Sequence, residues 1–364
     1  MCSFVGGAGH LVPQLPLHRA LADAGHDLTL VGRTSAISAA PTGLYRNVAA
    51  RADRRSGPSG GIAPLAPLDV EHELEVIEHH FAGAAALRSA SAVRELLPGA
   101  DLLVCDELDL GAIAAAQHAG VPSVVVAVIA SGALVRPTRL VQALGRLGDE
   151  LGLSGPVRPH GNRFVVPFAP RMRDPLFPAP ANALWMRPSI GTSPASNGSV
   201  VATLGTEFNT ESGDLFDRIL AALALLDAPA VLAVGNDVNP GRFGPQPERI
   251  RVERFVDLDA LIPRAGAVVH HGGSGLFLHS VLGGAAQVVL PMGADQPFTG
   301  QRVDDLGLGV TLNPISVTPS EIAAAITRVG ADVGARERTA ALRAATLRLP
   351  APADVVAEIQ ASLL

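Results

Sequence analysis

The 364-residue chain contains no lysine, so all 28 of its basic residues are arginine. This absence excludes the lysine of a Walker-type phosphate loop, a Schiff base and a lysine general base. Anionic ligands must be held by arginine, histidine, hydroxyl groups, helix starts or a metal ion. Only two cysteines occur, Cys2 and Cys105, and both lie in apolar, strand-like runs. We expect them to be small buried side chains, not a disulfide or a metal site.

An excess of charge of one sign is also missing. The formal net charge is −6 and the pI is near 6.0, so the sequence offers no basic surface for nucleic acid or an anionic membrane. No charged leader precedes a long apolar core, and no apolar run is long enough to span a bilayer. We therefore expect a cytoplasmic protein that binds neither nucleic acid nor membrane.

Apolar residues make up 48% of the chain, and its length predicts two domains. Short apolar runs alternate with segments of helical periodicity. The strand-like runs are 3–5, 28–31, 102–105, 123–129, 200–204, 230–234, 251–256, 267–269 and 287–290, and clear helical segments are 110–119 and 215–226. Such alternation predicts α/β domains, each a parallel sheet covered by helices.

The distribution of prolines indicates where one domain ends and the next begins. Many prolines fall between Gly155 and Gly198, where we expect the domains to connect. The predicted boundaries are 1–190 for an amino-terminal domain, 191–350 for a carboxyl-terminal domain and 351–364 for a terminal helix. That helix could dock on either half, and docking back on the amino-terminal domain is preferred. Residues 57–67, rich in Gly and Pro, predict a mobile loop before a helix that begins near Leu68.

The most informative stretch is Val-Val-His-His-Gly-Gly-Ser-Gly at 268–275, which joins an apolar run to a helical pattern. Glycines let backbone N–H groups at a helix start approach a ligand, and the helix dipole favours phosphate oxygens. A histidine just ahead adds a hydrogen bond, and a positive charge if protonated. The alternative is an ordinary tight turn with two satisfied histidines. Downstream, Asp295 and Gln296 follow a strand, where a carboxylate and an amide suit sugar hydroxyls.

Three other features have a structural alternative. Phe255 follows a strand and could stack on a base, with core packing as the alternative. His72 and His79 lie two turns apart on one helix face, which allows a metal site but is more typical of a solvated helix. Asp257 and Asp259 spell D-x-D, yet the surrounding sequence predicts a strand-to-helix turn and not a metal motif.

Residues 251–312 resemble the nucleotide-sugar signature of the family 1 glycosyltransferases, which are inverting enzymes of the GT-B fold. The likeness rests on HHGGSG…GGAAQVVLPMGADQPFTGQRV, on TLGTEFNTESGDL at 203–215 and on GGAGHLVPQLPLHRALADAGHDLTLV at 6–31. It is greatest to actinobacterial enzymes of natural-product and antibiotic biosynthesis. The resemblance implies two Rossmann-like α/β domains facing across a cleft. It also implies transfer without metal or cofactor, with a dTDP- or UDP-sugar as co-substrate.

The resemblance assigns donor-binding residues. His271 matches the histidine that contacts the diphosphate, and the family's helix-start amides match Gly273, Ser274 and Gly275. Leu276 departs from the family, which usually has a threonine or serine there to bind phosphate. Because one neutral hydrogen bond contributes about 1 kcal/mol, we expect altered donor affinity and not inactivity.

Four further donor-binding residues follow from the resemblance. Asp295 and Gln296 match the pair that holds donor-sugar hydroxyls. Phe255 occupies the position where a tryptophan often stacks on uracil or thymine. Thr206 lies in the loop that faces the phosphates.

The resemblance assigns catalytic residues to the amino-terminal half. His10 matches the general base, and Asp106 matches the carboxylate that orients it, with Glu107 as the alternative if the register slips by one. The base would take a proton from the acceptor, while His271 and the helix start at 272–276 would stabilise the leaving diphosphate. The expected partners are a nucleotide-sugar donor, a small hydrophobic acceptor and, as an open question, a second copy in a homodimer.

Other functions stay open at this point. The acceptor atom is expected to be oxygen, with N- or C-glycosylation as alternatives. A nicotinamide-dependent oxidoreductase is disfavoured because the full G-x-G-x-x-G spacing is absent, and Gly32-Arg33 stands where an acid is expected. A catalytically silent homologue that acts as an auxiliary partner is the third reading. The presence of His10, Asp106, His271 and Asp295 argues against it, and Leu276 argues slightly for it.

Overall fold

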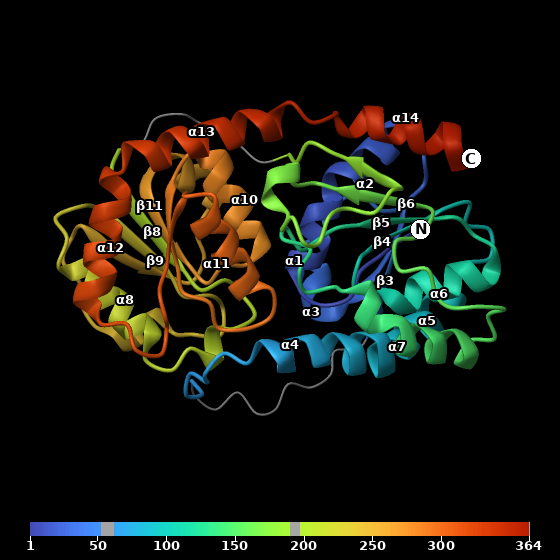
Figure 1. Ribbon diagram of the computed structural model, residues 1–364, viewed down its shortest axis with the longest axis horizontal. Coiled ribbons are helices and arrows are strands. Elements are labelled where there is room, and N and C mark those ends of the chain that lie inside the picture. Colours follow the sequence, from blue (N-terminus) through green and yellow to red (C-terminus); the bar gives the residue numbers. More distant parts are fainter. Residues whose placement is uncertain (52–61, 190–196, 364) are drawn as a thin grey trace. The chain divides into compact units, whose positions relative to one another are not determined.

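The structure is a computed structural model that describes residues 1–51, 62–189 and 197–363 (Figure 1). The chain divides into two compact units. Unit 1 comprises Met1–Ser56, Glu71–Ser189 and Leu347–Leu364, and unit 2 comprises Gly57–Val70 and Ile190–Thr346. Each unit is a parallel sheet with helices on its faces, so the predicted α/β class is confirmed.

Unit 1 contains a seven-stranded sheet of order β3-β2-β1-β4-β5-β6-β7, with parallel neighbours throughout the described strands. Its strands are β1 (Cys2–Ser3), β2 (Thr29–Arg33), β3 (Asn47–Arg51), β4 (Leu103–Asp106), β5 (Ser123–Val126), β6 (Arg163–Val166) and β7 (Ala183–Trp185). The direction of the strand order reverses between β1 and β4. In open α/β sheets ligands bind at such a switch point, beside the carboxyl ends of the strands.

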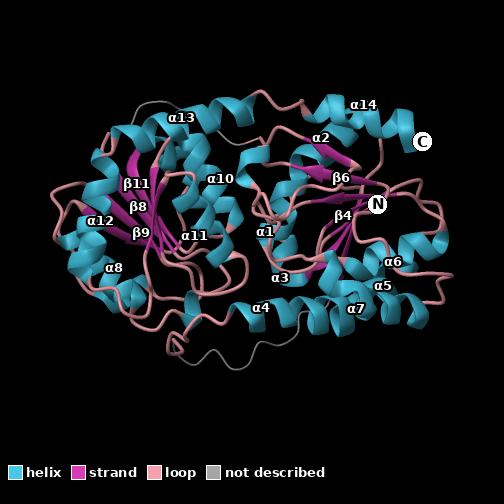
Figure 2. Ribbon diagram, viewed as in Figure 1, coloured by secondary structure: helices cyan, strands magenta, loops and turns pink. Residues whose placement is uncertain are grey.

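Helices cover both faces of this sheet (Figure 2). The α-helices of unit 1 are α1 (Ala8–Leu11), α2 (Leu15–Asp23), α3 (Thr34–Ile37), α4 (Val70–Val76), α5 (Ala85–Arg94), α6 (Leu110–Ala119), α7 (Pro137–Glu150) and α14 (Pro352–Leu363), and a π-helix, η2 (Ile77–Ala84), joins α4 to α5. The segments η1 (Val12–Gln14) and η3 (Pro170–Met172) are 3₁₀ turns. Helices α5 and α6 approach so closely that a Cβ on Gly111 would lie 1.8 Å from the carbonyl oxygen of Ala86, so this position requires glycine.

The terminal helix α14 packs on α2 within unit 1. Its buried side chains Val355, Val356 and Ile359 belong to the same apolar core as Leu17 and Leu21. Unit 1 therefore contains the last helix of the chain as part of its core.

Unit 2 contains a six-stranded sheet of order β10-β9-β8-β11-β12-β13, again with parallel described pairings. The strands are β8 (Ser199–Thr203), β9 (Ala230–Ala233), β10 (Ile250–Glu253), β11 (Ala265–His270), β12 (Ala286–Val289) and β13 (Gly309–Thr311). The helices are α8 (Leu215–Ala224), α9 (Leu258–Leu261), α10 (Ser274–Gly283), α11 (Gln296–Asp305), α12 (Pro319–Ala331) and α13 (Val333–Leu347), with 3₁₀ turns η4 (Asn209–Glu211), η5 (Pro240–Phe243) and η6 (Ile262–Arg264). The switch point of this sheet lies between β8 and β11.

The proline-rich stretch 155–198, where the sequence places the domain connection, contains more regular structure than predicted. Strands β6 and β7 lie within it, and unit 1 extends through it to Ser189. Residues 190–196 lie outside the described residues. The prolines precede or follow these two short strands and stand outside them, where a missing backbone donor is tolerated, and β7 is the edge strand of the sheet.

The loop expected at 57–67 has no helix or strand from residue 62 onward, where the structure describes it. Residues 62–70 pack on unit 2. The N–H of Ala63 donates to the carbonyl oxygen of Thr210 at 2.6 Å, and the N–H of Gly213 donates to the carbonyl oxygen of Ala63 at 3.0 Å. Leu65 is packed against the core of unit 2, and the next helix begins at Val70. Residues 57–61 lie outside the described residues.

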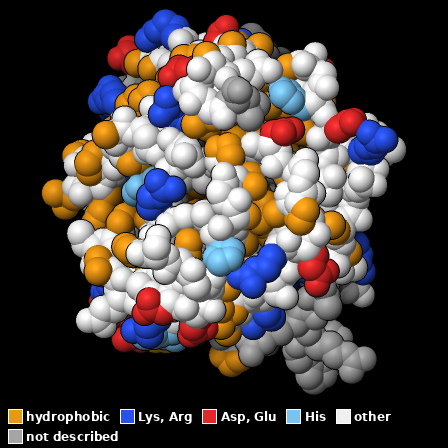
Figure 3. All heavy atoms as spheres, turned by 90° about the vertical axis from the view of Figure 1, so that its right-hand side faces the viewer, with side chains coloured by type: hydrophobic (Ala, Val, Ile, Leu, Met, Phe, Trp, Pro, Cys, Tyr) orange, Lys and Arg blue, Asp and Glu red, His pale blue; other side chains and the backbone are white. Residues whose placement is uncertain are grey.

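Among the helices of the described ranges, none combines the length and the apolar character that crossing a bilayer requires. On the face drawn in Figure 3, arginine and acidic side chains are interspersed with apolar ones. This mixture agrees with the slightly negative net charge of the chain.

Candidate active site

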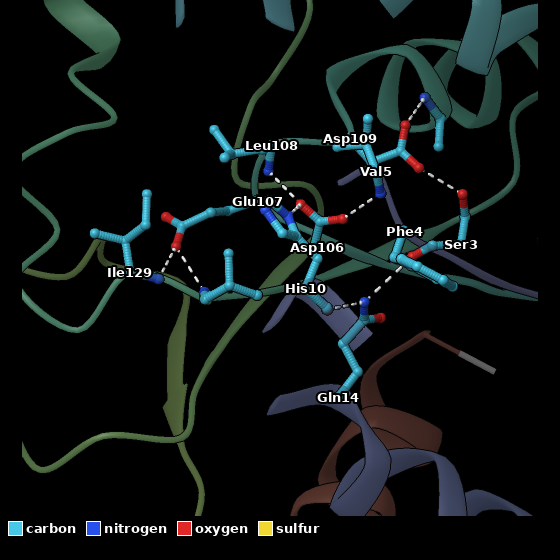
Figure 4. A network of polar contacts seen from close by, with 12 residues as sticks. Ser3, Phe4, Val5, His10, Gln14, Asp106, Glu107, Leu108, Asp109 and Ile129 are labelled. Carbon is cyan, nitrogen blue, oxygen red and sulfur yellow. Dashed lines mark hydrogen bonds and ion pairs between the residues drawn. The ribbon is translucent and has the colours of Figure 1, made fainter. Parts of the chain in front are cut away.

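The side chains of His10 and Asp106 meet at the switch point of the unit 1 sheet. The Nδ1 atom of His10 lies 3.1 Å from Oδ1 of Asp106 (Figure 4). His10 belongs to α1, directly after the turn that follows β1, and Asp106 is the last residue of β4. Because β1 and β4 are paired in parallel, both residues emerge at the carboxyl edge of the sheet. The two residues that the resemblance assigns to catalysis are therefore in contact.

Asp106 is completely buried and held by three donors. Besides His10, the N–H of Val5 donates to its Oδ2 at 2.7 Å and the N–H of Leu108 donates to its Oδ1 at 2.8 Å. Burial raises the pKa of Asp106, whereas the charge and hydrogen bond of His10 act in the opposite direction. The donors fix the direction of the carboxylate, which in turn fixes the orientation of the imidazole ring.

The glycine turn after β1 makes room for the ring of His10. Gly6 has φ +91°, and a Cβ at this position would lie 2.6 Å from both Cδ2 and Nε2 of His10. The amide of Gln14 adds a second constraint, because its Nε2 donates to the carbonyl oxygen of His10 at 2.8 Å. The position of the histidine is thus set by the backbone around it as well as by Asp106.

Glu107 does not take the place of Asp106. Its Oε1 accepts hydrogen bonds from the N–H groups of Val128 and Ile129, both at 2.7 Å (Figure 4). Burial raises the pKa of Glu107 to about 7. The alternative register, in which Glu107 orients His10, is therefore wrong for this structure.

Asp109 is a buried carboxylate that the sequence analysis missed. It accepts hydrogen bonds from the hydroxyls of Ser3 and Ser89, and from the N–H of Ala112 as the N-cap of α6. The guanidinium of Arg51 lies 3.5 Å from its Oδ2. An aspartate just before a helical pattern is the usual N-cap signal, so part of this role could be anticipated. The contacts with Ser3 and Arg51 depend on the sheet order.

In unit 2, the two adjacent histidines at the end of β11 have different environments. His270 is fully buried, its Nε2 lies 3.1 Å from Oε1 of Gln287, and its Nδ1 accepts from the N–H of Gly272 at 3.1 Å. Burial lowers the pKa of His270 to about 4. His270 is therefore a buried histidine with both ring nitrogens paired, as in the alternative of an ordinary tight turn.

The ring of His271 lies against two glycines. A Cβ on Gly205 would be 2.5 Å from its Cε1, and a Cβ on Gly273 would be 2.5 Å from its Nε2. Within the described part of the chain, the buried Nδ1 of His271 has no hydrogen-bond partner. Burial and, to a smaller extent, neighbouring His270 lower the pKa of His271 to about 3, so the ring is neutral near pH 7. It therefore offers a hydrogen bond, and no positive charge, until a ligand changes its surroundings.

Helix α10 begins directly after this histidine. Gly273 is its N-cap and has no side chain to cap it. Backbone N–H groups therefore form this start of the helix, at the edge of the sheet. Gly275 is exposed in the first turn. Leu276 is only 7% exposed and packs in an apolar cluster with Ile262 and Val268. The side chain that departs from the family is thus a core residue here.

The loop after β12 holds the predicted sugar-binding pair. The hydroxyl of Ser274 donates to Oδ2 of Asp295 at 2.6 Å. Gln296 is buried, and its Oε1 accepts from the N–H groups of Met292 at 2.7 Å and Gly293 at 3.2 Å. The structure therefore uses the amide oxygen of Gln296 inside the loop, and a contact between Gln296 and a sugar stays a prediction.

Phe255 and Thr206 lie in turns that follow β10 and β8. Phe255 is 64% exposed, so the core-packing alternative is wrong. Thr206 is exposed in the turn next to Gly205, the glycine that lies on the ring of His271. The carboxylate of Asp257 caps α9 by accepting from the N–H of Ala260 at 3.1 Å. The D-x-D sequence is therefore a strand-to-helix turn, as predicted.

Neither cysteine takes part in these contacts, since Cys2 and Cys105 are free and buried, as predicted. In the ranges that the structure describes, no group of three or more His, Cys, Asp and Glu side chains could hold a metal ion. His79 instead lines a cavity of about 180 Å³ with Glu78 and Arg146.

Known proteins similar to this chain are glycosyltransferases. Residues 217–362 match the family described as Erythromycin biosynthesis protein CIII-like, C-terminal domain. The L-demethylnoviosyl transferase of Streptomyces niveus is 29% identical over 97% of this chain and 94% of its own length. The crystal structure of glycosyltransferase VinC in complex with dTDP has a TM-score of 0.77 at 20% identity and covers 100% of this chain and 99% of VinC. Spinosyn rhamnosyltransferase SpnG complexed with spinosyn aglycone has a TM-score of 0.79 at 20% identity and covers 99% of this chain and 100% of SpnG.

The two parallel α/β sheets, together with these similarities, define the class: the chain is a glycosyltransferase with the GT-B fold. Residues 217–362 are similar to the erythromycin CIII-like domain, and over nearly its full length the chain is similar to a glycosyltransferase of Streptomyces niveus.

Proposed function

We propose that this glycosyltransferase moves a sugar from a dTDP- or UDP-sugar to a hydroxyl of a small hydrophobic acceptor, with inversion at the anomeric carbon. The observation that carries the proposal is the contact between Nδ1 of His10 and Oδ1 of Asp106 at 3.1 Å. The dTDP bound by VinC and the aglycone bound by SpnG support the choice of donor and acceptor classes.

His10 serves as the general base in this proposal. A hydroxyl is a weak nucleophile near neutral pH, and general-base assistance typically contributes about 10²–10⁴ in rate. Since Nδ1 is paired with Asp106, the proton of the acceptor hydroxyl is taken at Nε2. Asp106 then stabilises the imidazolium that forms, as the carboxylate of a hydrolase triad does.

The leaving nucleoside diphosphate is stabilised from unit 2. Negative charge grows on the diphosphate as the glycosidic bond breaks, and the backbone N–H groups at the start of α10 are fixed donors for it. His271 supplies a further donor, and a bound diphosphate raises the pKa of its ring. Asp295 and Gln296 hold hydroxyls of the sugar, Phe255 stacks on the base and Thr206 faces the phosphates. We propose that the reaction needs no metal ion and no cofactor.

Several finer properties stay predictions. The acceptor atom is oxygen in the leading proposal, and nitrogen or carbon in the alternatives. A homodimer and a cytoplasmic location also stay predictions, as does the identity of the sugar.

Two experiments test the proposal. Titration calorimetry with dTDP, UDP and NAD⁺ should detect binding of at least one nucleoside diphosphate and none of NAD⁺. Incubation with a panel of aglycones and activated sugars, followed by NMR of the product, should then show the anomeric configuration opposite to that of the donor. Retention of configuration contradicts the proposed mechanism. A chain that binds dTDP but transfers no sugar favours the catalytically silent homologue.

A further inference from the structure

The hydroxyl of Ser274 links two loops of unit 2. Ser274 is the first residue of α10 and is 6% exposed, and its Oγ donates to Oδ2 of Asp295, 21 positions along the chain, at 2.6 Å. Asp295 is the N-cap of α11. The contact therefore ties the helix start proposed to hold the diphosphate to the carboxylate proposed to hold the sugar.

The loop that carries Asp295 is strongly constrained. Ala294, directly before it, has φ +52° and is the one non-glycine residue with a positive φ in the described chain. An L-residue in this region is sterically disfavoured, so surrounding contacts must maintain it. The two hydrogen bonds from Met292 and Gly293 to Gln296 close the loop on itself. This strained turn determines the position of the Asp295 backbone, and the hydrogen bond from Ser274 determines the rotation of its carboxylate.

We propose that Ser274 is a positioning residue that sets the orientation of the Asp295 carboxylate and so determines how tightly the sugar of the donor is held. The inference rests on the proposed function. With Oδ2 fixed by the hydroxyl of Ser274, the carboxylate does not have to be ordered when a sugar hydroxyl binds. Pre-ordering of this kind increases affinity for the group that is recognised.

The same hydroxyl could instead bind phosphate, since it lies at a helix start. A serine hydroxyl has one proton to donate, and here the acceptor is Asp295. Loss of the hydroxyl should therefore weaken recognition of the sugar and leave recognition of the diphosphate unchanged. If Ser274 instead bound phosphate, its loss would weaken the binding of dTDP and of dTDP-glucose alike.

The test compares the affinities of the wild type and of Ser274→Ala for dTDP and dTDP-glucose by titration calorimetry. UDP and UDP-glucose are used if the wild type prefers UDP. We expect Ser274→Ala to weaken binding of dTDP-glucose about fivefold, as for the loss of one hydrogen bond of ordinary strength, and to leave dTDP within about twofold. Ser274→Thr keeps the hydroxyl and should restore most of the affinity for dTDP-glucose.

Two controls separate positioning from a general structural effect. Ser280→Ala removes another buried hydroxyl of α10, which donates to the carbonyl oxygen of Leu276 at 2.8 Å, and should leave the ratio of the two affinities unchanged. In the background of Asp295→Ala, the further change Ser274→Ala should have no additional effect on dTDP-glucose, because the group that it positions is gone.

If Ser274→Ala loses the same affinity for dTDP as for dTDP-glucose, the inference is overturned. It is also overturned if the losses of affinity caused by Ser274→Ala and Asp295→Ala add up in the double variant. Either result leaves the proposed function standing. A wild-type protein that binds no nucleoside diphosphate overturns the proposed function, and the inference with it.

Discussion

His10 and Asp106 are 96 residues apart in the chain, yet Nδ1 of one lies 3.1 Å from Oδ1 of the other. The contact follows from the sheet order, because Ser3 on β1 pairs with Cys105 on β4 in parallel register. The turn after β1 and the last residue of β4 then emerge at the same edge. Asp106 ends β4 and contacts the histidine, whereas Glu107, in the turn that follows the strand, accepts hydrogen bonds from the N–H groups of Val128 and Ile129.

The first prediction concerns the carboxylate of this pair. Asp106→Asn should lower the transfer rate by about 10²–10⁴, because an amide can hold the imidazole in the wrong tautomer and cannot stabilise the imidazolium. Affinity for dTDP should stay within about twofold, because the proposed donor residues belong to unit 2. Transfer kinetics and titration calorimetry measure the two quantities.

The control is Glu107→Gln, the neighbouring buried carboxylate. Glutamine keeps an oxygen that can accept from Val128 and Ile129, so transfer should remain close to that of the wild type. An unimpaired Asp106→Asn variant, or an equal loss in Glu107→Gln, would remove Asp106 from its assigned role.

The second prediction uses two glycines near the dyad. Gly6→Ala places a Cβ where the His10 ring lies, at a φ of +91° that alanine rarely adopts. The ring must move away from Asp106, and transfer should fall at least tenfold, with a loss of about 1–2 kcal/mol in the free energy of unfolding.

Gly9→Ala is the matched control, since a Cβ there would meet nothing within 4 Å and the residue lies within α1. Alanine is the better helix former by about 1 kcal/mol, so this variant should be as stable as the wild type or more so and should remain active. Equal activity of the two variants would contradict the role assigned to Gly6.

Much of the fold can be predicted from the sequence. The helical segment 110–119 coincides with α6, because Asp109 caps its start and Gly120, at φ +71°, ends it. Strand-like runs lie within one to three residues of the observed strands where several β-branched residues occur together, as at 123–129 and 230–234. These elements are specified locally.

Other elements depend on distant contacts and could not be predicted. Residues 62–67 have no periodicity that indicates their packing on unit 2, which comes from hydrogen bonds between Ala63 and the loop at Thr210. Strands β6 and β7 are short and lie between prolines, so the local pattern favours a loop. The same limit applies to the site. The resemblance identifies Ser274 and Asp295 separately, but their contact requires the left-handed turn at Ala294.

The third prediction concerns the exposed ring of Phe255. If the ring stacks on the nucleotide base, Phe255→Ala should weaken dTDP binding by about 1–3 kcal/mol, the usual contribution of base–aromatic stacking. Because the side chain is 64% exposed, the free energy of unfolding should hardly change. Phe255→Trp should bind dTDP at least as tightly as the wild type. Calorimetry and urea denaturation provide the two measurements.

Leu225→Ala provides the comparison, because Leu225 is 61% exposed in the same unit and has no assigned role. It should alter neither affinity nor stability. If Phe255→Ala behaved in the same way, the stacking role would be excluded.

The last prediction concerns stability and pH through His18, which is fully buried in α2 with Nδ1 lying 2.8 Å from the hydroxyl oxygen of Tyr45. Burial lowers the pKa of His18 to about 3, whereas an unfolded chain has a histidine pKa of about 6.5. Between these values the unfolded chain binds a proton that the folded chain does not. The stability associated with this group is therefore complete above pH 6.5 and is lost as the pH falls toward 3.

His18→Asn removes the titrating group and keeps a polar side chain facing Tyr45. Between pH 6 and pH 5 its free energy of unfolding should fall less steeply than that of the wild type, by about 1.4 kcal/mol per pH unit at most. Tyr45→Phe removes only the hydroxyl, so it should lose about 1 kcal/mol of stability while keeping the wild-type pH dependence. Urea denaturation at the two pH values measures these slopes. Burial, and not Tyr45, lowers the pKa of His18, so only the change at His18 should alter the pH dependence of stability. Identical slopes for His18→Asn and the wild type would show that His18 does not cause the loss of stability at low pH.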